Sequence, residues 1–388
     1  MIAYVDASQQ VHVANDDGSQ PRALEAGSSA YTWPVWRPRG DGLAFSGIAS
    51  GSNGSGHIRL YFHDLAAGAA CAIYDNQPGA DAIAPRTPHY ALWSPDGETI
   101  AFVARTWPSG LALFASRVSE EGEPMRLLTG GPLFLSWSPD SRYLLVHGRE
   151  QHYLVDFQAD GSLARVPGNS RSYMAPSWAP NHNRLAILRQ GAGNSQTLLV
   201  GDAEGATANA VAEVEGAAAF AWSPDGEMIG LVRDLQGRSR FYGGLWVADS
   251  KGGGERKLAE GLILSFFWSP NGKEIAYITP SEGAEGSVRW GLVEIEGGSV
   301  RYLADFRPTE EQLTAYMFFD QYAQSHDPWA PDGRSLIFSG TLGYHEGRAL
   351  LPRAEEADVL VADVAGADPP AAVARGFLGF WSPPLPGR

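Results

Sequence analysis

Short apolar segments rich in β-branched and aromatic residues alternate with short polar turns along the whole chain. In many places an apolar segment ends in tryptophan, a polar turn follows, and a second apolar segment comes next, as in Trp93-Ser-Pro-Asp-Gly-Glu-Thr-Ile-Ala-Phe102. Proline suits the second position of a type I turn and glycine suits the fourth, while the serine can form a local hydrogen bond. Two apolar segments joined by such a turn predict a β-hairpin.

This hairpin pattern recurs along the chain with a period of 41 to 61 residues. The units open at Trp36, Trp93, Trp137, Trp178, Trp222, Trp268, Trp329 and Trp381. Most units continue with a third apolar segment and a shorter fourth one, such as Leu111–Val118 and Met125–Thr129. A repeat of this length with four strands per unit is typical of a β-propeller blade. The tryptophan is expected to lie between adjacent sheets, where a large ring fills the gap between blades.

The last unit is completed by the first residues of the chain. Trp381 is followed by seven residues, while Ile2–Val5, Val11–Asn15 and Arg22–Glu25 read as three further strands. We therefore expect residues 1–388 to form one all-β domain, an eight-bladed propeller whose last blade joins strands from both termini, with residues 1–25 completing it. Such closure removes exposed sheet edges. Seven blades are the alternative, if one degenerate unit is not a true sheet.

The repeat Trp-Ser-Pro-Asp-Gly-x-x-Ile-Ala-Phe resembles that of TolB-like propellers, the WD40-like PD40 group, over essentially the whole chain. Similar repeats form the propellers of prolyl-oligopeptidase-type peptidases and of the tricorn protease. The units at Trp36, Trp178 and Trp381 depart from the pattern, and Asn181 and Asn183 stand where Asp and Gly are usual. TolB carries an α/β domain before its propeller that this sequence does not show, so the resemblance implies the fold and not a role in colicin import.

Charge and cysteine content narrow the function classes. The chain holds 44 acidic against 29 basic residues, a formal net charge of −15, which argues against nucleic-acid binding and against adsorption to anionic lipid. The single cysteine, Cys71, excludes a disulfide framework and a multi-cysteine metal site, and it is expected to be a small buried residue. No apolar stretch predicts membrane insertion and no secretion signal is visible, so we expect a cytoplasmic protein, with a trimmed exported form as the alternative.

The common catalytic motifs are missing from the sequence. There is no Gly-x-Ser-x-Gly, P-loop, Gly-x-Gly-x-x-Gly, His-Glu-x-x-His or EF-hand loop. We therefore predict no catalytic residue, no metal ligand and no cofactor. The aspartates of the repeated turn are explained by turn chemistry. His57 with His63, and His147 with His152, are spaced so that a pair could bind a metal, although ordinary structural roles are favoured.

Loop length distinguishes the two faces of the predicted disc. One face carries short turns, and the other carries long loops and the link Asp305–Gln324. Within that unit Thr314–His326 is aromatic-rich. It either caps the axial funnel or, as favoured here, packs Phe318 and Phe319 into the core. Candidate binding residues on the loop-rich face are Trp33, His89, Tyr90, Trp107, Tyr173, Asp320, Tyr322 and His326.

Two functions follow as hypotheses. The first is a non-catalytic scaffold or recognition module that binds a protein or peptide through the loop-rich face, including as an accessory subunit of a larger complex. The second is a propeller-type enzyme, a lyase or a glycoside-active hydrolase, with His89, His326 and Asp320 as acid/base groups in the axial funnel. The oligomeric state and the identity of the partner stay open.

Overall fold

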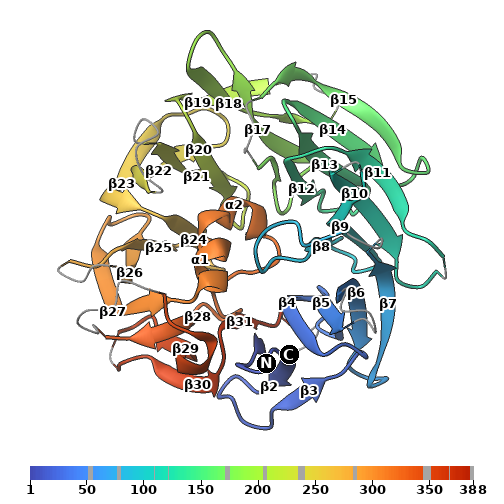
Figure 1. The fold of residues 1–388 in the computed structure, drawn as a ribbon. Helices are drawn as coiled ribbons and strands as arrows, with labels where there is room; N and C mark the ends of the chain where they lie inside the picture. Colours follow the sequence, from blue (N-terminus) through green and yellow to red (C-terminus); the bar gives the residue numbers. More distant parts are fainter. Residues whose placement is uncertain are drawn as a thin grey trace.

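A computed structural model describes residues 1–50, 56–76, 80–108, 110–120, 122–170, 175–203, 208–234, 241–282, 286–343, 351–366 and 368–384. Within these residues the strands form six four-stranded antiparallel sheets and one seven-stranded sheet. The sheets stand around a common axis, as expected for a β-propeller (Figure 1). Among the described residues no helix is both long and apolar enough to cross a membrane.

The five sheets that follow the N-terminal strands share one design, in which the strand nearest the axis comes first and each next strand pairs outside it. The first is β4 (Ala30–Trp36), β5 (Gly42–Ser50), β6 (Gly56–Asp64) and β7 (Ala69–Asp75). The second is β8 (Tyr90–Trp93), β9 (Thr99–Thr106), β10 (Gly110–Arg117) and β11 (Met125–Thr129). The third is β12 (Leu133–Trp137), β13 (Tyr143–Gly148), β14 (Gln151–Asp156) and β15 (Ser162–Asn169). The fourth is β16 (Ser177–Trp178), β17 (Arg184–Gln190), β18 (Ser195–Asp202) and β19 (Ala208–Glu215). The fifth is β20 (Ala218–Trp222), β21 (Met228–Asp234), β22 (Tyr242–Asp249) and β23 (Glu255–Ile263).

The seven-stranded sheet comprises two consecutive repeat units. It runs β24 (Ser265–Trp268), β25 (Glu274–Pro280), β26 (Val288–Glu294), β27 (Val300–Pro308), β28 (Ser335–Leu342), β29 (Asp358–Asp363) and β30 (Ala371–Arg375). Its two parts are joined where the end of β27 pairs with the end of β28. Trp329, which opens the second unit, keeps only an isolated bridge to Leu336. A short 3₁₀ helix, Ala354–Glu356, precedes β29.

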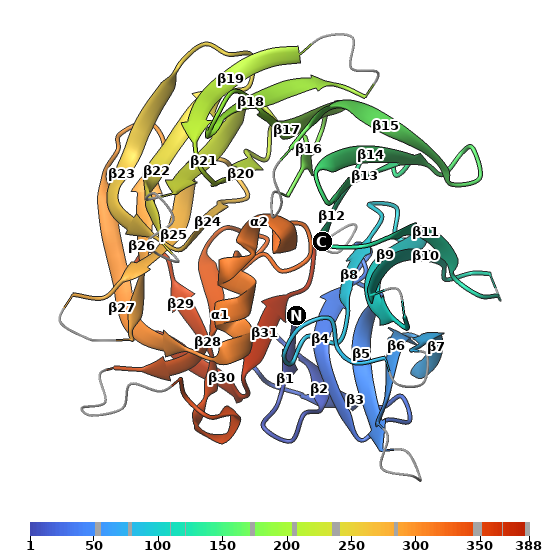
Figure 2. The same ribbon diagram turned by 45° about the horizontal axis from the view of Figure 1, so that its top comes forward.

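Two short helices that the sequence did not predict lie in the link between β27 and Trp329. They are α1 (Glu310–Met317) and α2 (Phe319–Tyr322), and both views place them at the centre of the ring (Figures 1 and 2). Thr309 caps α1, because its hydroxyl accepts a hydrogen bond from the Gln312 backbone N–H at 3.1 Å. Helices of this length are marginal alone, so packing inside the ring stabilises them.

The two ends of the chain meet in one sheet, as predicted. β31 (Leu378–Trp381) pairs with β1 (Ile2–Val5), and β2 (Val11–Ala14) and β3 (Arg22–Leu24) extend the sheet outwards. Ala3 lies opposite Phe380 in this pairing. The strand order β3-β2-β1-β31 therefore closes the ring with strands from both ends.

The motif tryptophans link neighbouring sheets. In five units the indole N–H donates to the carbonyl of the residue just before the preceding motif tryptophan. These bonds join Trp93 to Val35, Trp137 to Leu92, Trp222 to Ser177, Trp268 to Ala221 and Trp329 to Phe267, at 3.1 to 3.3 Å. In the other three units, at Trp36, Trp178 and Trp381, the indole N–H has no such partner. These are the units whose sequences depart from the repeat.

The aspartates of the repeated turn have the structural role that the sequence predicts. The hydroxyl of Ser223 donates to Asp225 at 2.6 Å, and the same carboxylate oxygen accepts the backbone N–H of Glu227 at 3.0 Å. These bonds lower the pKa of Asp225, because they favour its ionised form.

Candidate functional site

The segment Glu310–Tyr322 fills one end of the axial space, on the loop-rich side where the innermost strands begin (Figures 1 and 2). We call it the plug. The Phe319 side chain is fully buried and lies 4.9 Å from the Phe266 ring and 6.1 Å from the Phe267 ring, measured between centroids. Phe318, which was expected to be buried with it, is 38% exposed instead. The turn between α1 and α2 points this ring away from the core, so the expectation was right for one phenylalanine and wrong for the other.

Four of the predicted binding residues form one buried aromatic cluster with the plug. The Trp33 ring stacks on Tyr322 at 5.1 Å and meets His326 edge-on at 5.6 Å. Tyr90 packs edge-on against Tyr322 at 5.3 Å, and its hydroxyl donates to the Gln321 carbonyl at 2.7 Å. All four side chains are buried. They hold the plug in place and offer no surface to a partner in this structure, so their role in binding stays a prediction.

A loop from residues 80–88 clamps the outer end of the plug. Trp33 sits in a bulge of β4 with a φ of 52°, and its indole N–H donates to the Arg86 carbonyl at 2.9 Å. The Arg86 guanidinium in turn lies 3.0 Å from Glu311 and 3.4 Å from Glu310, both at the start of α1. This clamp fixes α1 to the innermost strands of the first two sheets.

The three groups predicted as an acid/base set lie in different surroundings. His89 is within 3.0 Å of Ser46 Oγ and 2.9 Å of Asn76 Oδ1, and burial lowers its pKa to about 3. Burial likewise lowers the pKa of His326 to about 3, and it raises the pKa of Asp320 to about 6. No hydrogen bond or ion pair among the described residues joins any two of them. Their geometry therefore does not support general acid/base catalysis by this set.

The remaining residues singled out in the sequence differ in their exposure and location. Trp107 lies at the tip of the β9–β10 hairpin and is 75% exposed, so it is the predicted binding residue that a partner reaches most easily. Tyr173 lies outside the described residues. Cys71, expected to be buried, is exposed because β7 is the outermost strand of its sheet.

Neither of the two histidine pairs belongs to a group of three possible metal ligands among the described residues. His147 and His152 face each other across β13 and β14, with ring centroids 4.6 Å apart. Burial, together with the nearby His147, lowers the pKa of His152 to about 3. Among the described residues no three His, Cys, Asp or Glu side chains come close enough to hold a metal ion.

A cavity of about 530 Å³ lies at the other end of the axis, on the side of the repeated turns. We call it the axial cavity. Motif tryptophans and turn prolines from six units dominate its lining, and the segment after α2 supplies four further residues. The lining comprises Trp36, Pro38, Pro180, Ala221, Trp222, Pro224, Phe266, Phe267, Trp268, Pro270, Ala323, Gln324, Ser325, Asp327, Trp329, Pro331, Trp381, Ser382, Pro383 and Pro384. Half-exposed and exposed prolines surround its mouth.

Sequence reasoning missed this cavity and the aspartate that lines it. Asp327 is the sole ionisable side chain among the described residues that line it. Its Oδ1 accepts the Trp329 backbone N–H at 2.9 Å, and the side chain is otherwise open to the cavity. The protein around the cavity desolvates this carboxylate and raises its pKa to about 7. The signal in the sequence was the repeat itself, since it brings every Trp-x-Pro turn to one face.

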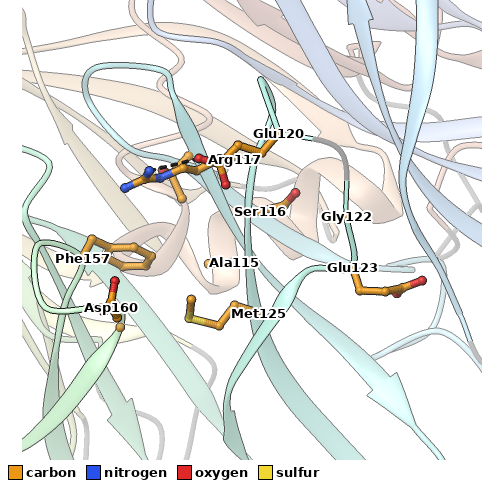
Figure 3. Close-up of a pocket in the computed structure, with 11 residues that line it drawn as sticks. Ala115, Ser116, Arg117, Glu120, Gly122, Glu123, Met125, Phe157 and Asp160 are labelled. Atoms are coloured by element: carbon orange, nitrogen blue, oxygen red, sulfur yellow. Dashed lines mark hydrogen bonds and ion pairs between the residues drawn. The ribbon is translucent and has the colours of Figure 1, made fainter.

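A second cavity, of about 330 Å³, lies in the outer part of the molecule, between the end of β10 and the β14–β15 turn (Figure 3). Its floor includes Met125 and Phe157, and Glu123 and Asp160 stand at its edges. Arg117 is already paired with Glu120 at 3.1 Å. This cavity is a groove between two neighbouring sheets, with charged residues at its edges and without the many aromatic residues and prolines that line the axial cavity.

Comparison with known proteins identifies the fold and leaves the function undetermined. No protein-family profile matches the chain. A stretch of 129 residues is 27% identical to the uncharacterized peptidase YuxL of Bacillus subtilis (strain 168), covering 32% of this chain and 17% of that protein. The match thus spans about a sixth of the length of that relative.

Solved structures confirm the β-propeller. Dipeptidyl peptidase 4 of Porphyromonas gingivalis matches with a TM-score of 0.58 and 11% identity, over 96% of this chain and 58% of that one. Oligogalacturonate lyase of Vibrio parahaemolyticus matches with a TM-score of 0.51 and 12% identity, over 88% and 93%. A TolB of Agrobacterium tumefaciens is also among the neighbours, with a TM-score of 0.41 and 16% identity over 86% and 94%. At these identities the likeness concerns the fold alone.

Proposed function

We propose that this chain is a non-catalytic recognition module and that it binds a segment of a protein partner in the axial cavity. The observation that carries the proposal is the cavity itself, which the segment just after α2 lines on one side and the turn prolines surround at its mouth. Its volume of about 530 Å³ lies in the range of pockets that enclose a small ligand. A chain end or a few side chains fit such a space, whereas a folded domain does not.

The lining has the chemistry of a peptide-binding surface. Five tryptophans and seven prolines contribute to it. Rigid rings of this kind bury apolar area while losing little conformational entropy, which favours binding of an extended segment. The net charge of −15 favours a partner with a basic surface, and it fits the role of an accessory subunit in a larger complex.

The proposal moves the binding site from the loop-rich face to the opposite one. On the loop-rich face the plug occupies the axis, and the aromatic cluster is buried beneath it. Trp107 is the exposed candidate that remains there. The enzyme alternative is less well supported, because no hydrogen bond or ion pair among the described residues joins any two of His89, His326 and Asp320.

We also propose that the ring has eight blades, with the seven-stranded sheet counting as two. The support is that both of its parts carry the repeat, opening at Trp268 and Trp329. In the second part the innermost strand is reduced to the bridge between Trp329 and Leu336, while the Trp329 indole N–H still bonds to the Phe267 carbonyl at 3.1 Å. That bond is the same contact that joins four other pairs of consecutive units.

Affinity purification with matched variants tests the proposed function. Ala323→Trp fills the floor of the axial cavity and Pro384→Trp narrows its mouth, and neither removes a side-chain hydrogen bond. Trp107→Ala, on the opposite face, is the control. We expect a stoichiometric partner of the wild-type chain to be lost at least tenfold from both cavity variants and retained by the control, with all three melting near the wild type. Retention by the cavity variants, loss from the control, or no partner at all under native conditions would overturn the proposal.

A further inference from the structure

Among the described residues, the lining of the axial cavity carries a single ionisable side chain. Of the described residues that line it, Asp327 alone is ionisable, and no basic side chain pairs with it. Its one hydrogen bond comes from the Trp329 backbone and occupies a single carboxylate oxygen. The second oxygen thus faces a space walled by aromatic rings and prolines. The Asp327 side chain is exposed, so a positively charged group that enters the cavity can reach its carboxylate.

Resting on the proposed function, we infer that the group bound in the axial cavity is a cation. The Asp327 carboxylate binds an ammonium or guanidinium group, and the surrounding tryptophan rings pack on the apolar stem that carries it. Four of the lining tryptophans are at most 6% exposed, so they form an apolar wall for the stem and do not present open ring faces to the cation. The other polar lining groups, on Gln324, Ser325 and Ser382, can accept or donate further hydrogen bonds.

The protonation of Asp327 supports this inference. The Asp327 side chain is exposed to the cavity, and desolvation by the protein that surrounds the cavity raises its pKa to about 7, with no charged neighbour contributing to the shift. The adjacent His326 is held neutral, because burial lowers its pKa to about 3. A bound cation would stabilise the ionised carboxylate and release the proton that it carries below pH 7. Affinity for a cation is therefore expected to rise between pH 6 and pH 8 and then to level off.

The same ammonium chemistry is found on a lysine of a protein segment and on a free organic amine, and the experiment distinguishes them. Two charged probes are used, the peptide acetyl-Pro-Lys-Pro-amide and phenethylammonium. Each has an uncharged counterpart of similar shape, acetyl-Pro-norleucine-Pro-amide and 2-phenylethanol. Binding is measured by calorimetry and by tryptophan fluorescence, since five tryptophans line the cavity.

The matched variants are Asp327→Asn and Asp332→Asn. The first keeps an oxygen that accepts the Trp329 N–H and removes the charge. The second changes the turn aspartate of the same unit, which accepts the Arg334 N–H, and Asn271 already occupies the equivalent place in the preceding unit. We expect a charged probe to bind at least tenfold more tightly than its neutral counterpart in the wild type and in Asp332→Asn, and not in Asp327→Asn.

The outcomes distinguish the proposed binding of a cation from the proposed recognition of a protein segment. Binding of the lysine peptide supports a cationic protein segment, and binding of phenethylammonium alone supports a free amine. Equal binding of charged and neutral probes would overturn the cation while leaving peptide recognition intact. No binding of either charged probe at millimolar concentration would also overturn the cation proposal. The purification experiment with the cavity-filling variants would then decide alone whether the cavity binds a protein segment.

Discussion

Single buried residues set the geometry of the axis. Trp33 has a φ of 52°, a backbone conformation that bulky residues rarely adopt. Stacking on Tyr322, contact with His326 and the bond to the Arg86 carbonyl together hold it there. Strain of this kind persists only when the surroundings stabilise it. The aromatic cluster therefore positions the plug, and with it the residues just after α2 that line the axial cavity.

Single buried histidines make the stability of the fold sensitive to acid. His89 lies between Ser46 and Asn76, and its pKa is lowered from 6.5 to about 3 by burial. Between these two values the unfolded chain binds a proton that the folded chain does not, so stability is lost as the pH falls below 6.5. For one residue the slope is at most about 1.4 kcal/mol per pH unit. We expect His89→Gln to lower the slope of unfolding free energy against pH by about this amount between pH 6 and 4.5.

Urea unfolding at a series of pH values measures this slope. His57→Gln is the control, because the His57 side chain is 43% exposed, on β6. It is expected to leave the slope unchanged. A His89→Gln protein with the same acid sensitivity as the wild type would mean that His89 takes up its proton without unfolding.

The sequence predicts the role of a residue where its contacts are local in the chain. The serine and aspartate of each turn bond within five residues of one another, so composition and spacing were enough. Trp33, in contrast, meets Tyr322 from almost three hundred residues away. Asp327 could not be predicted as a site residue, because a lone aspartate before a motif tryptophan has no distinctive sequence pattern. Only the folded propeller places it in a cavity.

At the scale of elements, the plug is the feature that the repeat does not explain. The strands were predictable, because each is bounded by a turn and recurs with the unit. α1 and α2 span only eight and four residues, too few for a helical period to stand out from the surrounding link. Their stability comes from the ring that encloses them, so no local sequence pattern predicts these two helices.

Two neighbouring phenylalanines test how the plug is held. Phe319 is fully buried against Phe266 and Phe267, while Phe318 is 38% exposed. We expect Phe319→Ala to lower the free energy of unfolding by about 3–5 kcal/mol, because it leaves a cavity among aromatic rings. Phe318→Ala, next to it in the chain, is expected to cost below about 1 kcal/mol. Denaturant unfolding compares the two, and equal costs would mean that the plug is not docked in the ring.

At the scale of the whole molecule, closure depends on the sheet that joins both ends of the chain. The tryptophan bond that links most neighbouring units is missing for Trp381, within this sheet, and for Trp36, in the next one. Backbone pairing and packing must therefore hold the closing sheet. β1 supplies that pairing, since it bonds to β2 on one side and to β31 on the other. The repeat predicted this arrangement because the strands missing from the last unit were present at the other end.

A single methyl group tests the closure. A Cβ on Gly376, just before β31, would meet the Val5 carbonyl oxygen at a distance that real Cβ atoms do not show. The backbone there cannot yield, because Phe377 N–H bonds to the same carbonyl at 3.0 Å. We expect Gly376→Ala to cost about 1–3 kcal/mol of unfolding free energy and to speed hydrogen exchange in Ile2–Val5.

Gly253→Ala serves as the control for this substitution. Its added Cβ would lie 3.3 Å from the flexible side chain of Asp249, which can move away. If the closing sheet holds the ring together, Gly376→Ala lowers the melting temperature of the whole molecule in one transition, and the control leaves it nearly unchanged. Faster exchange confined to residues 2–5 with an unchanged melting temperature would show that the ring stays closed without this pairing. The remaining sheets would then hold one another by their tryptophan contacts alone.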